Sequence, residues 1–552
     1  MAGSGSIVLS SDNLNIDEIY PFGRADGSKE DFDKFIPFTN QMAWGGLALR
    51  KDDISVPAII GRKGSGKTYY LRRIEDHGIQ RDDIYVVRSN SKAPDPELIR
   101  RLGSELDPND GSSVWQLFWR RAIIFSLTSL FLCTRPSGEQ SRFLGNVKIS
   151  REEFYRRYSD IFDEDEFLTS IEIFTAANNI LNRFANRDDL LEYLKLKWWS
   201  NLEGELGLAL ERCPPICYYL DHFDDDLRQG PGLFIDCQKG LYYTIQDLKK
   251  SDYFANRLHI TTTMRDIVWA AVMESEHLTK QLDQYRAILH WSPAAARTYF
   301  GRKVALLPSQ FAIMNNHDEV RSLESWLGFS EVENVDFGVT EEVFSYILRH
   351  THNVPRELNL VGHRICMQIA LVKEFGAPLS AREFREQVNY ISGKFGAELL
   401  KVTQHYIASS AYSTRYVHEI YHGHTESNFH ISAHVEKVLD AFLTDLGKDV
   451  FSFSELQTSL DRYQNEIAEE GDSAKYAQYK IENALWLQGL LGYRTYSEQN
   501  KLSEDIFHSN GNFDQLFIPR NQDHYVLHPS LKGNIKLKKA GERPIGGKWN
   551  HS

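Results

Sequence analysis

One short stretch of the chain holds glycines, a lysine and a threonine in the order G-x-x-x-x-G-K-T, from Gly61 to Thr68. Glycines at these positions let consecutive backbone N–H groups turn toward one anion, and a helix that begins there adds its positive end. Lys67 would reach the outer phosphates of a nucleotide, and the Thr68 hydroxyl would ligate Mg²⁺. The pattern therefore predicts that ATP and Mg²⁺ bind at a loop formed by Gly61, Gly64, Ser65, Gly66, Lys67 and Thr68.

The segments on either side of this loop have the pattern that such a loop requires. Residues 56–60 form an apolar run typical of a buried strand, and residues 67–77 have a helical pattern. Residues 83–88 are β-branched and aromatic, which predicts a second strand. A strand, a loop, a helix and a strand in this order begin a parallel α/β sheet. The alternative is a chance glycine turn, against which the flanking strand and helix argue.

A cluster of carboxylates follows another apolar run, residues 216–220. Ligands of parallel sheets lie at the carboxyl ends of the strands, so Asp221 is placed where an acid that organises Mg²⁺ would be. Asp224 or Asp225 would come next and could polarise the water that attacks a terminal phosphate. A solvated acidic turn is the alternative interpretation.

Arg265 follows a third predicted strand, residues 258–263. At the carboxyl end of that strand it could sense the γ-phosphate or stabilise charge during phosphoryl transfer. A salt bridge with the neighbouring Asp266 would also explain an arginine there.

Together these motifs resemble the phosphate-loop ATPases related to the AAA+ initiator and STAND classes. The chain is most similar to the bacterial STAND-like group whose first motif reads Gly-Arg-Lys-Gly-Ser-Gly-Lys-Thr and whose second ends in Asp-Gly-Leu-Asp-Glu. The first motif matches residue for residue, whereas His222 replaces the glycine and Asp225 the glutamate of the second. Residues 289–304 resemble the link into the helical lid of this group. Residues 352–358 resemble the Pro-Arg motif of the lid, which implies that Arg356 reaches back to the nucleotide.

Pattern and resemblance together predict an α/β chain with a phosphate-loop NTPase core, a helical lid and a winged-helix-like domain. Residues 94–211 are expected to be an insertion in this core, and their helical and aromatic pattern is more typical of core packing than of base stacking. The order of helices and a hairpin near the C-terminus is that of a winged helix. The expected boundaries are a leader at 1–50, the core at 51–290 with the insertion at about 94–211, the lid at 291–425, the winged-helix-like domain at 426–535 and a basic tail at 536–552.

The resemblance implies a regulatory ATPase that acts as a nucleotide-controlled switch or oligomerising sensor. Such proteins assemble when triggered, several of them in bacterial defence against phage, and a separately encoded effector would act with this chain. One alternative is an ATP-dependent DNA-binding protein of the initiator or transposition-regulator type, with DNA contacted through the C-terminal domain. Another is a scaffold that binds nucleotide without turnover, because the altered second motif leaves the base uncertain.

The amino-acid composition limits the binding partners and the cellular compartment that can be expected. The net charge is -13 and the sequence pI is about 5.8, so no global basic field draws the chain to nucleic acid or an anionic membrane. The five cysteines lack paired metal-ligand spacing, which fits a reducing compartment. Residues 114–133 are the best membrane candidate, but Gln116, Arg120 and Arg121 interrupt them, so a buried helix and a cytoplasmic protein are expected.

Overall fold

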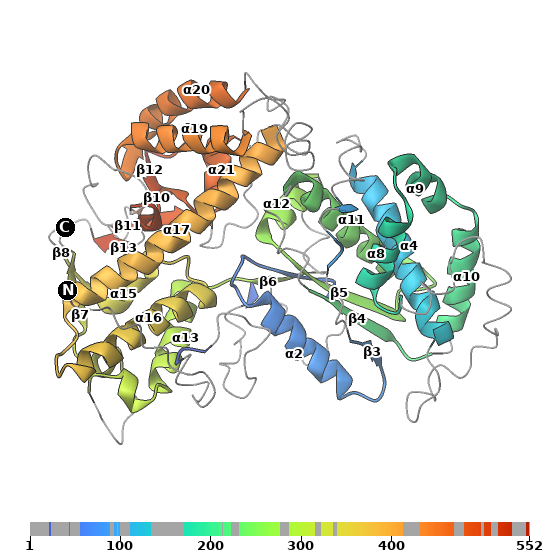
Figure 1. Cartoon of the computed structure of the whole chain (residues 1–552), viewed down its shortest axis with the longest axis horizontal. Helices are drawn as coiled ribbons and strands as arrows, with labels where there is room; N and C mark the ends of the chain where they lie inside the picture. The colour runs from blue at the N-terminus through green and yellow to red at the C-terminus, as the bar shows by residue number, and fades with distance from the viewer. Residues whose placement is uncertain are drawn as a thin grey trace, which may run out of the picture.

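The structure is a computed structural model, and it describes most of the 552 residues (Figure 1). The described residues are 21–23, 43–44, 56–88, 93–95, 98–99, 111–133, 170–211, 213–221, 231–275, 286–314, 322–334, 339–411, 431–468, 480–497, 502–508, 517–532 and 548–550.

A parallel sheet forms the centre of the first half of the chain. Five strands run in parallel in the order β6-β2-β5-β4-β3, and β1 adds to the β6 edge in the antiparallel direction. Every residue of β4 is buried, as expected for a strand covered on both faces. The prediction of an α/β fold with a parallel sheet is therefore confirmed. The strands are β1 (Ala43–Trp44), β2 (Ala58–Ile60), β3 (Tyr85–Val87), β4 (Ile216–Leu220), β5 (Leu258–Met264) and β6 (Arg286–Leu289).

The two faces of this sheet are covered by different helices. Helix α2 (Lys67–Ile79) packs on one face against Ile59 and Tyr219. Alternate strand residues point the other way, and Tyr218 and Leu220 pack against the insertion helices instead. The chain thus leaves β2 through α2 on one face and leaves β5 through α12 (Asp266–Ser275) on the other. This reversal opens a crevice at the carboxyl ends of β2 and β5, where α/β sheets bind ligands.

The insertion between β3 and β4 is helical in its described residues, and its aromatic side chains form core. Trp115, Phe118, Trp119 and Trp199 are buried, whereas Trp198 is 41% exposed. Four further aromatic residues of the insertion, Phe154, Tyr155, Tyr158 and Phe162, lie outside the described residues. The helices are α4 (Gly111–Cys133), α8 (Ile173–Arg183), α9 (Arg187–Leu194) and α10 (Trp198–Leu210), and α11 (Pro231–Lys250) packs against α4 after β4.

The interrupted apolar segment, residues 114–133, lies in helix α4, and its two arginines form ion pairs. Arg120 and Arg121 both pair with Glu203 of α10, at 2.8 and 2.6 Å. A buried helix was expected here and is observed. Among the residues that the structure describes, no helix combines the length and apolar character that crossing a bilayer requires.

The described residues between Pro293 and Phe395 are mostly helical and contribute to one core, which includes Phe300, Trp326 and Phe344. Ser292 caps the first helix by accepting from the backbone N–H of Ala295, and a proline occupies the first turn. The elements are α13 (Pro293–Ala305), η6 (Ser309–Phe311), α14 (Leu323–Leu327), β7 (Glu331–Asn334), β8 (Val339–Glu342), α15 (Val343–Arg349), α16 (Pro355–Glu374) and α17 (Ala381–Ala411).

In the C-terminal part, the described residues include the α-helices α19, α20 and α21 and an antiparallel sheet of order β13-β11-β10-β12-β9. Helix α17 lies between this part and α16, and it contacts α16 as well as α19 and α21 (Figure 1). The elements are α19 (Ile431–Leu446), β9 (Val450–Ser452), α20 (Phe453–Ala468), α21 (Ile481–Leu487), β10 (Leu491–Ser497), β11 (Leu502–Phe507), β12 (His524–Leu527), η10 (Pro529–Leu531) and β13 (Lys548–Asn550).

Candidate functional site

The glycine-rich stretch forms a tight loop at the carboxyl end of β2. Gly64 has φ 85° and Gly66 has φ 96°, a region that residues with a side chain rarely adopt. A Cβ added to Gly61 would collide with the Ser65 hydroxyl. The backbone N–H of Gly61 donates to the carbonyl of Met264 at 3.1 Å, which fixes the loop to β5. Each glycine of the motif therefore has a local geometric reason.

Lys67 begins helix α2 and directs its ammonium back into this loop. Its side chain is buried, and Nζ donates to the carbonyls of Gly61 at 3.0 Å and Arg62 at 3.2 Å. The Trp291 indole donates to the carbonyl of Ser65 at 2.9 Å, so the chain after β6 supports the loop from outside. Thr68 is half-buried beside Lys67. The positive charge and the hydroxyl thus lie together at the start of one helix.

Asp221 lies at the same edge of the sheet as the loop. It directly follows β4, and its Oδ1 accepts from the Thr263 hydroxyl at 2.7 Å. Thr263 in turn pairs with Ile59 of β2, which places Asp221 two strands from the loop, on the order of 10 Å. Asp224 and Asp225 fall in residues 222–230, outside the described residues.

These groups suit a nucleotide with Mg²⁺. The left-handed glycines and the start of α2 suit a phosphate, and the oxygens of Thr68 and Asp221 are hard ligands of the kind that Mg²⁺ prefers. Within the described ranges, His, Cys, Asp and Glu side chains nowhere gather in threes to form a metal site. Cys213 and Cys217 are buried, as expected for core residues.

Arg265 and Arg356, the two predicted arginines, line one pocket beside the loop. Arg265 follows β5 directly. Arg356 lies in the first turn of α16, and its backbone N–H donates to the carbonyl of Gly64 at 3.3 Å. A Cβ on Gly64 would lie 2.7 Å from the Arg356 Cβ. The start of α16 thus rests directly on the loop.

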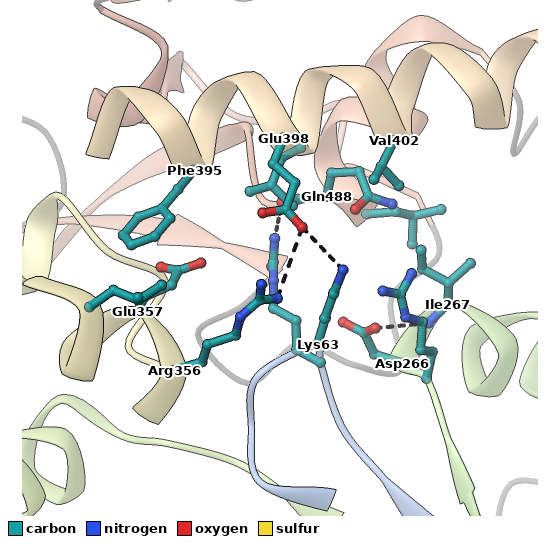
Figure 2. A pocket seen from close by; sticks show the side chains of 14 residues that line it. Lys63, Asp266, Ile267, Arg356, Glu357, Phe395, Glu398, Val402 and Gln488 are labelled. Atoms are coloured by element: carbon teal, nitrogen blue, oxygen red, sulfur yellow. Dashed lines mark hydrogen bonds and ion pairs between the residues drawn. The ribbon is translucent and has the colours of Figure 1, made fainter. Parts of the chain in front are cut away.

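Figure 2 shows this pocket between the loop, α16 and α17, with Gln488 of the C-terminal part among the residues that line it. It has a volume of about 630 Å³, part of it open to solvent. Its charged side chains are four cations and three carboxylates, and an apolar wall completes it. The cations are Arg62, Lys63, Arg265 and Arg356, the carboxylates Asp266, Glu357 and Glu398, and the wall includes Leu360, Phe395, Leu399 and Val402.

Two loop residues that the motif leaves unspecified make contacts that the sequence did not predict. Lys63 pairs with Glu398 of α17, with 3.1 Å between Nζ and Oε1. Burial lowers the pKa of Lys63, and Glu398 opposes that shift. Arg62 is buried and donates to the carbonyl of Gln488, next to Gly489. The partners are 335 and 426 residues away along the chain, so no local spacing could have revealed them.

Buried histidines join the start of α16 to the C-terminal part beside this pocket. The ring of His352 stacks on that of His528 with centroids 4.1 Å apart, and Glu357 lies 3.1 Å from His352 Nδ1. His508 lies 3.8 Å from Asp266, which follows Arg265. Burial lowers the pKa of His352 and brings that of His508 to about 4. The rings are therefore neutral near pH 7 and pack like other core side chains.

No protein-family model matches the chain, and no curated protein matches it either.

Proposed function

We propose that this chain is an ATP-binding and ATP-hydrolysing phosphate-loop NTPase that works as a nucleotide-controlled switch. The observation that carries the proposal is the conformation of the loop: Gly64 and Gly66 are left-handed between a buried parallel strand and helix α2. This is the backbone that can surround a phosphate with N–H groups. The position of Asp221 at the same sheet edge supports it further.

The residue roles follow from the chemistry of each side chain. Lys67 and the loop backbone would hold the outer phosphates, while Thr68 and Asp221 would hold Mg²⁺. ATP, when bound, supplies the phosphoanhydride bond that hydrolysis breaks. Asp224 or Asp225 would orient the attacking water, and Arg265 and Arg356 would stabilise the negative charge that develops. The proposed site residues are therefore the same as those predicted from the sequence, and the proposed catalytic base, Asp224 or Asp225, falls within residues 222–230.

The switch would act through two contacts with the phosphate loop, one made by the lid and one by the C-terminal part. Residues 291–425 would be the lid and residues 426–535 a winged-helix-like domain, for which the element order α19, β9, α20, α21, β10, β11, β12 is the support. The lid contacts the loop through Arg356, and the C-terminal part contacts it through Gln488. Phosphate in the loop would change the strength of both contacts and so shift the position of the two parts. Self-assembly, a separate effector and a role in bacterial defence against phage are proposed on the resemblance of the motifs.

DNA binding through the C-terminal part has less support. A recognition helix needs an exposed face that can enter a groove. All seven residues of α21 are buried. Contact with protein is therefore the better proposal for this part.

The direct test compares ATP binding by the unmodified chain and by Lys67→Ala. We expect the variant to lose binding, because the ammonium is the main cationic contact of the outer phosphates. Arg73→Ala, an exposed change on the same helix, is the matched control and should bind normally. Thermal unfolding of each variant would show that the fold is kept. Absence of ATP binding by the unmodified chain, or unchanged binding by Lys67→Ala, would contradict the proposal.

The mass of the protein in solution, with phosphate release followed in the same samples, separates the switch from the alternatives. A defined assembly that forms with ATP and Mg²⁺ alone supports the switch. Changes in mass and turnover that need double-stranded DNA would favour the DNA-binding alternative. Tight binding without phosphate release would favour the scaffold.

A further inference from the structure

One carboxylate bridges the loop and the start of α16. Glu398 Oε1 lies 3.1 Å from Lys63 Nζ and 3.9 Å from an Arg356 guanidinium nitrogen. Figure 2 shows Glu398 reaching down from α17 toward both cations. The two cations come from different elements, and a single anionic group holds them at once.

The surroundings of Glu398 are those of an anion site. Arg356 is fixed to the loop through its backbone N–H, so its side chain stays beside Gly64. Arg265 lines the same pocket and adds positive charge. Arginine and lysine bind carboxylates and phosphates through the same charge-assisted hydrogen bonds. A phosphate group that reached this place would meet the cations that now contact Glu398.

The two other carboxylates of the pocket are held by other partners. Glu357 accepts from the backbone N–H of His352 at 2.7 Å and lies beside the ring of the same histidine. Asp266 accepts from the backbone N–H of Ile267 at 3.1 Å and lies near His508. Glu398 is thus the pocket carboxylate that contacts the loop lysine and the lid arginine.

We propose that Glu398 competes with the terminal phosphate of a nucleoside triphosphate for Lys63 and Arg356, and so weakens the preference of the site for triphosphates over diphosphates. The inference rests on the proposed function and deepens it. A triphosphate carries the additional charge needed to displace the carboxylate, whereas a diphosphate leaves the pair of contacts in place. Displacement would release a contact that ties the loop to α17.

The test measures the affinity of Glu398→Gln for the β,γ-imido analogue of ATP and for ADP, both with Mg²⁺. Lys63 and Glu398 are 30% and 39% exposed, so their ion pair is modest in strength. We expect the analogue to bind about two- to fivefold more tightly to the variant, while the affinity for ADP stays within about 1.5-fold. Glu386→Gln is the matched control, because Glu386 lies on the same helix and pairs with Arg382 on an exposed surface. It should change neither affinity.

Repeating the measurement in the Lys63→Met variant distinguishes competition between Glu398 and phosphate from a general loosening of α17. In Lys63→Met the gain from Glu398→Gln should shrink, because only Arg356 remains for the two anions to share. An equal gain with ADP and the analogue, or an unchanged gain in Lys63→Met, would overturn the proposal. If the unmodified chain binds the analogue and Glu398→Gln does not improve it, the inference fails and the proposed function stands. If no variant binds either nucleotide, both fail.

Discussion

The guanidinium of Arg62, inside the phosphate-loop motif, donates to the backbone carbonyl of Gln488 in the C-terminal part. The two residues are 426 positions apart in the chain, and Arg62 is only 6% exposed. Gly489 has φ 69°, and a Cβ there would lie 2.6 Å from an Arg62 nitrogen, so the turn after α21 is shaped around the arginine. The loop and the C-terminal part are therefore directly connected.

The first prediction concerns this contact. Arg62→Met keeps an apolar stem but leaves the Gln488 carbonyl without its charged donor. We expect the free energy of unfolding to fall by about 1.5–3 kcal/mol, the value of a buried hydrogen bond to a charged group. Chemical denaturation would measure the loss, and amide hydrogen exchange should rise at residues 487–491. Arg382→Met, at an exposed ion pair, is the control and should have little effect. Unchanged exchange at residues 487–491 would argue against the connection.

A second prediction concerns Gly64. Alanine there would occupy a left-handed conformation and meet the Arg356 Cβ at 2.7 Å. We expect a loss of about 1–2 kcal/mol in stability from the backbone strain alone, and weaker ATP binding, because α16 must move away. Gly301→Ala is the matched control, since a Cβ at that helical position has no neighbour within 4 Å. That substitution should leave stability equal or slightly higher. Equal unfolding free energies for the two variants would contradict this prediction.

A third prediction assigns the metal role to Asp221. We expect Asp221→Ala to keep much of its nucleotide binding but to lose Mg²⁺-dependent phosphate release by about 100-fold or more, the effect of removing a group that orients a catalytic metal. Thr263→Val removes the hydroxyl that donates to Asp221 and should give a smaller loss. Turnover at a range of Mg²⁺ concentrations measures both variants. Full activity of Asp221→Ala would move the metal role to another residue.

A fourth prediction concerns the loss of folding stability at acidic pH. The pKa of the buried His508 is lowered from 6.5 to about 4, chiefly by desolvation. The unfolded chain therefore binds a proton before the folded one, and stability is lost as the pH falls from about 6.5 toward 4. His508 alone should cost about 2 kcal/mol between pH 7 and pH 5. Denaturation at both pH values should show this loss, and His508→Gln should reduce it. An identical pH dependence in that variant would remove His508 as the cause.

The sequence predicted the parts of the site that depend on local pattern. A glycine at a left-handed position, an apolar strand before a carboxylate and an arginine after a strand can each be recognised within a few residues. Hence Lys67, Asp221 and Arg265 were identified from pattern, whereas Arg356 came from the resemblance of residues 352–358 to the lid motif. The described structure brings the two arginines into one pocket and places Asp221 two strands from the loop, at the carboxyl end of the sheet. Their proposed roles stay predictions.

The residues that the sequence did not identify depend on distant packing. In the sequence, Glu398 is one of many glutamates in helical segments. Only the packing of α17 against the loop places it beside Lys63. Gln488 contributes a backbone carbonyl, which carries no side-chain signal at all. Strands β6 (Arg-Ala-Ile-Leu) and β11 (Leu-Ser-Glu-Asp-Ile-Phe) were missed, because charged residues interrupt the apolar run or alternation that identifies a strand.

The length of α17 has a mechanical consequence. Its 31 residues extend about 46 Å at the rise of an α-helix, and it contacts α16 as well as α19, α21 and η10. Such a helix acts as a rigid lever, so a tilt of about 10° at one end would carry the other end through about 8 Å. Glu398 lies near the middle of α17, so the same tilt about its contact with Lys63 would move each end of the helix by about 4 Å.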